Sequence, residues 1–124
     1  MEIRENRVVI LGAGIGAMAM GFENASCKVV AAYEHDERAR DLYENNAKDK
    51  TYKIGELDYN NFEEIPDMDI LACDFRRGFS FTSAGMGKTY HFRNAVKAVV
   101  EFKQPKKVFF LVPCGYARLK PFKA

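Results

Sequence analysis

The segment 12–16 and a single carboxylate are the residues whose types and spacing point most directly to chemistry. Residues 12–16 read Gly-Ala-Gly-Ile-Gly after the apolar run 8–11, and Glu34, 22 positions after Gly12, ends a second apolar run, 29–33. A glycine turn between a strand and a helix presents backbone N–H groups to a ligand. A carboxylate at the end of the next strand is placed to bind a ribose. The pattern predicts a nucleotide site, although Gly-x-Gly turns also serve plain close packing.

Strand-like and helix-like segments alternate around this turn. Strands are predicted at 8–11, 29–33, 52–54, 69–74 and 107–112. The first has the length of a buried strand, the third is short and expected at an edge, and the last is expected to be fully buried. Helices are predicted after residue 16, from the acidic cap Asp36 to residue 45 with Ala39, Leu42 and Tyr43 on the covered face, and from the cap Thr89 to residue 102. The glycine- and serine-rich segment 75–88 has no helical period and is predicted to be a mobile loop over the pocket.

This alternation predicts an α/β fold with a doubly wound, mostly parallel sheet and helices on both faces. The expected strand order is 3-2-1-4-5, in one Rossmann-like domain that spans 1–124. The fifth strand would then be an open edge. Because a long apolar strand is unstable with one side unpaired, we expect the tail, a second copy in a homodimer, or a partner subunit to cover it.

The net charge of +2 conceals a strong asymmetry along the chain. Residues 1–75 hold 8 Lys/Arg against 16 Asp/Glu, whereas residues 76–124 hold 11 against 1. The basic half could contact an anionic partner such as nucleic acid through its phosphates. Alternatively, the two halves neutralise each other within one fold or across a dimer.

Composition excludes several classes of protein. No apolar run approaches the roughly 18 residues of a membrane span, and residues 1–6 are too polar for a signal peptide, so we expect a cytoplasmic protein that does not bind a membrane. Cys27, Cys73 and Cys114 are odd in number and far apart, which argues against a disulfide scaffold and against a zinc site.

The order of short motifs along almost the whole chain resembles the first half of a DNA (cytosine-5) methyltransferase. The matching segments are 13–16 (Ala-Gly-Ile-Gly), 21–23, 29–36 with Ala39 and Tyr43, 55–57 (Gly-Glu-Leu), 65–72, Phe81, 84–85 and 103–111. The resemblance implies an enzyme that binds S-adenosylmethionine, flips a cytosine out of DNA and attacks its ring with a Pro-Cys thiolate before methyl transfer.

The chain departs from this family at the residues that carry the chemistry. Ile10-Leu11-Gly12 replaces the family's Asp-Leu-Phe, so the Phe that packs on adenine is absent and the turn looks more like a dinucleotide fingerprint. Arginine and glycine at 76–78 replace Pro-Cys, and Val112-Pro-Cys114 replaces the Glu-Asn-Val triplet. Without the thiolate, cytosine carbon-5 is not activated, so the resemblance predicts an impaired enzyme. RNA cytosine methyltransferases are similar in drawing a nucleophile from the neighbouring strand, which makes Cys114 the one candidate thiol.

The resemblance carries over Glu34 as the ribose-binding acid and Glu56 as the acid near the adenine amine. The residues expected to line the cofactor site are Gly12, Ala13, Gly14, Ile15, Gly16, Glu34, His35, Glu56, Leu57 and Asp74. Arg76, Arg77 and Lys88 are the expected nucleic-acid contacts, and no metal site is expected.

Three functions remain open at this point. The first is a methyltransferase-like domain that binds S-adenosylmethionine or S-adenosylhomocysteine and acts through a partner or nucleic acid. The second is an active, split-type subunit that needs a second chain. The third is a small NAD-binding protein, which the spacing of Gly12, Gly14 and Ala17 together with Glu34 favours.

Overall fold

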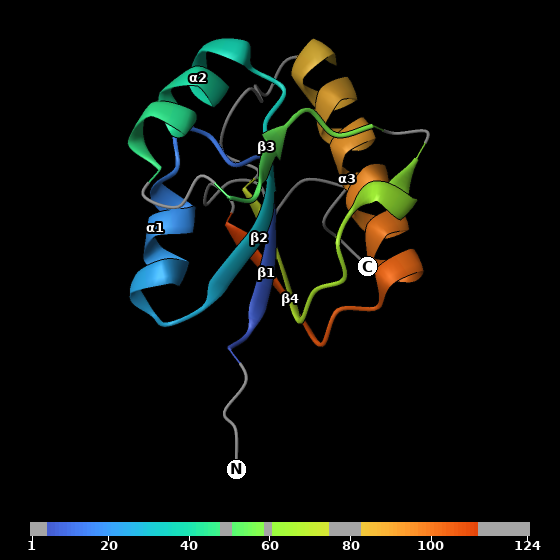
Figure 1. Cartoon of the computed structure of the whole chain (residues 1–124). Coiled ribbons are helices and arrows are strands. Elements are labelled where there is room, and N and C mark those ends of the chain that lie inside the picture. The colour runs from blue at the N-terminus through green and yellow to red at the C-terminus, as the bar shows by residue number, and fades with distance from the viewer. Residues whose placement is uncertain (1–4, 48–50, 59–60, 75–82, 112–124) are drawn as a thin grey trace.

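The structure of the chain is a computed structural model that describes residues 5–47, 51–58, 61–74 and 83–111, the backbone alone at 83–92. Strands and helices alternate as the sequence predicts (Figure 1). The elements are β1 (Arg7–Leu11), α1 (Ala17–Asn24), β2 (Lys28–Tyr33), α2 (Glu37–Asn46), β3 (Lys53–Gly55), the 3-10 helix η1 (Phe62–Glu64), β4 (Ile70–Asp74), α3 (Ser83–Lys103) and β5 (Lys107–Leu111).

The five strands form one parallel sheet in the order β3-β2-β1-β4-β5, so the predicted order is confirmed. The central strand β1 is the most deeply buried, with Val8 to Leu11 all at 0% exposure. Branched apolar side chains suit a strand that is covered on both faces. Because β1, β2 and β3 run parallel, their carboxyl ends lie at the same edge of the sheet, where ligands bind in open α/β folds.

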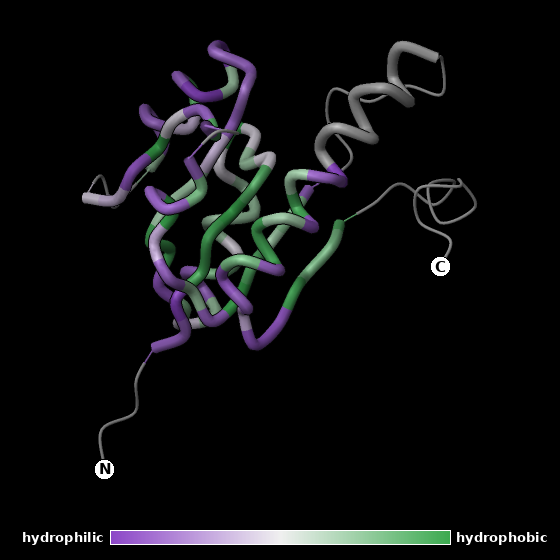
Figure 2. The backbone as a smooth tube through the Cα atoms, turned by 90° about the vertical axis from the view of Figure 1, so that its right-hand side faces the viewer, coloured by the Kyte–Doolittle hydropathy of each residue, from purple (hydrophilic) through white to green (hydrophobic). Residues whose placement is uncertain are grey.

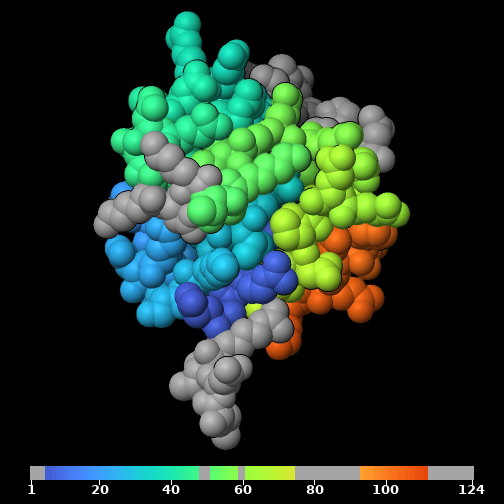
Figure 3. All heavy atoms as spheres, in the orientation of Figure 1, coloured from blue at the N-terminus to red at the C-terminus, as the bar shows by residue number. Residues whose placement is uncertain are grey.

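Helices cover both faces of the sheet, with α1 and α2 on one side and α3 on the other (Figure 1). Side chains of β1 alternate between the two layers, because successive strand residues point to opposite faces. Val8 and Ile10 pack with Tyr43 of α2, whereas Val9 and Leu11 pack with Val99 of α3. In the space-filling view, residues of β3 and of the segment before β4 close the front of the molecule between α2 and α3 (Figure 3).

The predicted start of α2 is confirmed by its cap. The Asp36 carboxylate accepts hydrogen bonds from the backbone N–H groups of Arg38 (2.9 Å) and Ala39 (3.3 Å), which have no partner inside the helix. Ala39 and Tyr43 are buried as expected, but Leu42 is 51% exposed, so its assignment to the covered face is wrong. Leu42 lies one position before Tyr43. Because neighbouring residues of a helix differ in direction by about 100°, the Leu42 side chain points away from the sheet.

Replacing Asp36 with alanine is expected to lower the free energy of unfolding by about 1 kcal/mol, because two N–H groups of the first turn lose their acceptor. Urea unfolding followed by circular dichroism measures the change. Asp41→Ala, which removes an exposed carboxylate from the body of the same helix, is the matched control. Equal losses in the two variants would contradict the capping role.

The helix α3 begins at Ser83, six residues before the predicted cap Thr89, so the loop prediction is wrong for 83–88. Gly85 and Gly87 suggested a break, since each glycine costs about 1 kcal/mol relative to alanine in a helix. The apolar stripe farther along stabilises the helix as a whole, because Val96 and Val99 pack in the core against the sheet and Ala95 is also buried. The rest of the predicted loop, 75–82, lies outside the described residues.

The strand β5 has the predicted position at the edge of the sheet but not the predicted burial. Val108, Phe109 and Phe110 are 37%, 48% and 50% exposed. In Figure 2, β5 runs along one margin of the described part and is hydrophobic over most of its length. A continuous apolar run predicts a strand but cannot distinguish a central strand from an uncovered edge.

In the described part of the chain, no helix is both long enough and apolar enough to cross a membrane.

Basic residues of the second half pair with acidic residues of the first at the amino end of the sheet. Lys103 Nζ lies 3.2 Å from Asp67 Oδ1, and Lys106 Nζ lies 3.8 Å from Asp69 Oδ1. The Asp69 carboxylate is buried and also accepts the backbone N–H of Arg7 at 2.9 Å. Neutralisation within the fold therefore accounts for part of the charge asymmetry.

Candidate functional site

The glycine turn after β1 is held by hydrogen bonds within the chain. Gly12, Gly14 and Gly16 have positive φ angles of 75°, 61° and 105°, which side chains rarely allow. The N–H groups of Gly12 and Ala13 both donate to the Tyr33 carbonyl, at 2.9 and 3.0 Å, and Gly16 N–H donates to the Ala13 carbonyl at 3.3 Å. The expectation that the turn presents these N–H groups to a ligand is therefore wrong for these residues.

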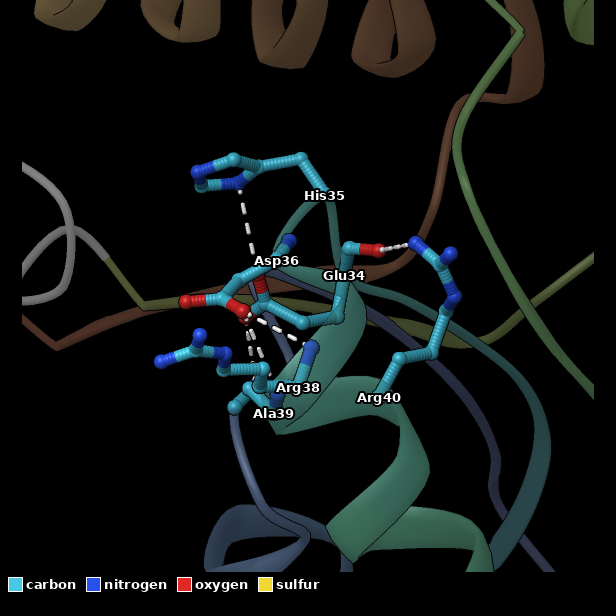
Figure 4. Close-up of polar contacts among 7 residues, drawn as sticks. Glu34, His35, Asp36, Arg38, Ala39 and Arg40 are labelled. Atoms are coloured by element: carbon cyan, nitrogen blue, oxygen red, sulfur yellow. Dashed lines mark hydrogen bonds and ion pairs between the residues drawn. The ribbon is translucent and has the colours of Figure 1, made fainter.

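Glu34 joins this turn to the carboxyl end of β2. Its Oε1 accepts the N–H of Gly14 at 2.8 Å, and its Oε2 accepts the N–H of Asp36 at 2.8 Å. The side chain is only 2% exposed, and His35 Nδ1 lies 3.3 Å from Oε2 (Figure 4). Arg40 donates to the Glu34 backbone carbonyl at 2.8 Å, which fixes the start of α2 against the strand.

The Glu34 carboxylate retains acceptor capacity for a ligand. Two carboxylate oxygens offer about four lone-pair directions, and each Glu34 oxygen uses one for a backbone N–H. Two donors placed as neighbouring hydroxyl groups could occupy the others, where a hydroxyl on Oε2 would compete with His35 Nδ1 at 3.3 Å. Because buried carboxylates bind such donors more strongly than exposed ones, Glu34 has the chemistry of a diol-binding residue.

A small cavity of about 40 Å³ lies beside Glu34 and brings five of the predicted site residues together. These residues are Gly12, Glu34, His35, Glu56 and Leu57. Leu11 and Tyr33 also line it, and the sequence analysis missed them. Both are the last residue of their strand, and that position was the available signal, since the ends of adjacent parallel strands share one edge.

The other predicted cofactor residues lie around this cavity or beyond it. Ala13 is buried in the turn, and Asp74 is buried at the carboxyl end of β4. Ile15 and Gly16 instead line a separate cavity of about 380 Å³ between α1 and α2, which has Tyr43 in its wall. We assign the candidate site to the smaller cavity, because the buried carboxylate lies there.

The side chains of four predicted functional residues fall outside what the structure describes. Arg76, Arg77 and Cys114 lie in segments that are not described. Lys88 lies on α3, and the structure describes only its backbone. Their roles stay predictions.

The two described cysteines do not supply a nucleophile to this site. Cys73, on β4, is 0% exposed, and burial raises the pKa of its thiol well above the usual range, which disfavours the thiolate. Cys27 precedes β2, whereas Glu34 follows it, so the two lie at opposite ends of that strand. A thiolate at the cavity would have to come from outside the described residues.

Comparison with known proteins identifies the family. Residues 7–110 match the family model of the C-5 cytosine-specific DNA methylases. The chain belongs to this family. The Type II methyltransferase M.HaeII of Haemophilus aegyptius is 34% identical over 110 residues, which are 84% of this chain and 33% of that protein. M.HhaI of Haemophilus parahaemolyticus is 31% identical over 111 residues, or 83% and 32% of the two chains. The chain thus spans about a third of the length of these relatives.

Solved structures with the same fold include other methyltransferases. The S. pombe Dnmt2 methyltransferase superposes with a TM-score of 0.71 and 17% identity, over 96% of this chain and 38% of that one. The plantazolicin methyltransferase BpumL, solved with SAH, gives 0.62 and 13% identity, over 93% and 42%. At this identity the likeness shows the fold alone, which is that of S-adenosylmethionine-dependent methyltransferases.

The site of this C-5 cytosine-specific DNA methylase domain fits S-adenosylmethionine better than NAD. S-adenosylmethionine carries a ribose but no phosphate. A dinucleotide brings a pyrophosphate, which needs turn N–H groups that this chain engages internally. The comparisons give no support to the NAD alternative.

Proposed function

We propose that this chain is the cofactor-binding part of a cytosine-5 methyltransferase and holds S-adenosylmethionine or S-adenosylhomocysteine at the carboxyl ends of β1, β2 and β3. The buried Glu34 carboxylate carries the proposal, because it faces the shared cavity and keeps acceptor positions for the two ribose hydroxyls. Glu56, which is exposed after β3 and lines the same cavity, would accept from the adenine amine. When bound, S-adenosylmethionine supplies an activated methyl group.

We further propose that the domain is catalytically impaired and acts through a partner subunit or a nucleic acid. The support is chemical. Arginine and glycine stand at 76–78, where the resemblance leads us to expect Pro-Cys, and Cys73 is too deeply buried to replace that thiolate. Phosphate contacts by Arg76, Arg77 and Lys88 would give such a domain a binding role without chemistry.

Isothermal titration calorimetry tests the cofactor assignment. We expect heat of binding with S-adenosylmethionine and S-adenosylhomocysteine, and none with NAD at the same concentrations. Saturable binding of NAD alone would replace this assignment with the dinucleotide alternative. Absence of binding by all three ligands at millimolar concentration would contradict the cofactor role.

An active, split-type subunit is the second candidate, favoured by the exposed apolar residues of the edge strand β5. In that case a second chain would complete the enzyme, with Cys114 or a partner thiol as nucleophile. Transfer of labelled methyl groups to DNA or RNA distinguishes the candidates. Activity that Cys114→Ala abolishes would assign the nucleophile and contradict impairment. Activity that survives Cys114→Ala would also contradict impairment and would move the nucleophile to another thiol.

A further inference from the structure

The His35 ring occupies one side of the Glu34 carboxylate. Its Nδ1 atom lies 3.3 Å from Glu34 Oε2, which also accepts the N–H of Asp36 at 2.8 Å. Oε1 accepts the N–H of Gly14 at 2.8 Å. Figure 4 shows the imidazole joined to the carboxylate by a dashed line, beside the start of α2. One of the two oxygens that the proposed ribose contacts need is thus shared with a side chain that can carry a positive charge.

His35 differs in kind from the charged side chains around it. Histidine is the residue type that ordinarily changes its charge between about pH 5 and 8, whereas carboxyl groups ordinarily do so near pH 4 and arginine stays charged. Charged residues around His35 are Glu34 at the end of β2, Asp36, Arg38 and Arg40 at the start of α2, and Glu56 after β3. By residue type, His35 alone among them belongs to the class that titrates near neutral pH.

A protonated His35 ring would compete with a ligand for Glu34 Oε2. Both nitrogens of a protonated ring donate, and a hydrogen bond that involves charged groups is roughly twice as strong as one between neutral groups. Glu34 is only 2% exposed, so water screens this contact poorly. A ribose hydroxyl that binds Oε2 has to displace the ring, and this displacement costs more when the ring is charged.

The exposure of His35 allows its ring to leave the carboxylate. The side chain is 64% exposed, so its nitrogens reach water in other rotamers. A neutral ring gives up at most one uncharged donor when it moves, and water replaces the lost hydrogen bond. Binding of a diol at Glu34 is therefore expected to cost little when the ring is neutral and more when it is protonated.

We propose that His35 sets the affinity of the cofactor site through its protonation, because the charged ring holds Glu34 Oε2 against one ribose hydroxyl. The inference rests on the proposed cofactor function of Glu34 and adds its regulation. The affinity for S-adenosylmethionine or S-adenosylhomocysteine then rises with pH as the ring loses its charge. At intermediate pH, ligand binding displaces the ring from the carboxylate, and a proton passes from His35 to the buffer.

Isothermal titration calorimetry at about pH 5.5 and 7.5 tests the role of His35. The ligand is S-adenosylhomocysteine, which has no sulfonium charge to repel the ring. For the unaltered chain we expect about fivefold weaker binding at the lower pH, the difference between a charged and a neutral hydrogen bond. His35→Leu should bind equally at both pH values, and His35→Lys should bind weakly at both. His91→Leu removes the only other histidine and should keep the fivefold ratio. A packing contact between ring and ligand cancels in this ratio, because pH does not alter it.

Proton release gives a second measurement on the same variants. Titrations at about pH 6.5 in phosphate and in Bis-Tris, whose heats of ionisation differ, count the protons released per ligand bound. We expect release of a fraction of a proton from the unaltered chain and none from His35→Leu. A pH-independent affinity, proton uptake, or a pH dependence that persists in His35→Leu would overturn the role of His35 and leave the cofactor site intact. Absence of binding at both pH values would contradict the cofactor function itself, and this inference with it.

Discussion

Replacing Glu34 with glutamine is expected to lower the affinity for S-adenosylmethionine about 100-fold. Hydrogen bonds to a charged acceptor contribute about 1.5–3 kcal/mol each, and the carboxylate offers acceptor positions for two ribose hydroxyls. Glutamine keeps the shape of the side chain, but its amide nitrogen replaces one of the two oxygens and cannot accept a hydrogen bond. The N–H of either Gly14 or Asp36 therefore loses its acceptor, which also weakens the turn. Isothermal titration calorimetry measures the loss.

Two control variants separate this role from a general loss of charge. Glu37→Gln removes an exposed carboxylate from the first turn of α2 and should leave the affinity within about twofold, because exposed charges contribute little. Glu56→Gln, at the exposed rim of the cavity, should have an intermediate effect. An unchanged affinity in a folded Glu34→Gln variant would remove Glu34 from the cofactor site. Thermal melting establishes that the variant is folded.

Leu71→Ala is expected to lower the free energy of unfolding by about 2–5 kcal/mol. Leu71 is 0% exposed on β4 and packs in the layer between the sheet and α3, so its truncation leaves a cavity. Leu42→Ala removes the same atoms from a side chain that is 51% exposed and should cost less than about 0.5 kcal/mol. Urea denaturation of both variants measures the difference. Similar losses would contradict the placement of α2 on the sheet.

The fold was predictable from the sequence because local patterns agree along most of the chain. Short apolar runs alternate with helical periods, and this indicates a parallel sheet, whose expected order 3-2-1-4-5 is the one observed. Asp36 was recognisable as a cap because an acidic residue precedes the first helical turn. The position of Glu34 at the end of the second strand was likewise visible in the spacing.

The features that could not be predicted depend on contacts between distant segments. Glycines in 83–88 argue locally against a helix, and tertiary packing of the rest of α3 overrides that preference. The exposure of Phe109 depends on what lies beside β5, which an apolar run does not encode. The hydrogen bonds of the turn depend on the distance in the fold between the end of β1 and the end of β2. The sequence therefore indicated the glycines but not the groups that accept hydrogen bonds from the turn.

The hydrogen bonds from the N–H groups of Gly12 and Ala13 to the Tyr33 carbonyl restrict the motion of the glycine turn. Glycine-rich segments usually sample many conformations, and a ligand must then restrict them at an entropic cost. Here the donors come from the main chain and the acceptor from the end of a buried strand, so the turn is already ordered before a ligand arrives. Amide protons at these two positions should exchange with deuterium as slowly as those of the neighbouring strands.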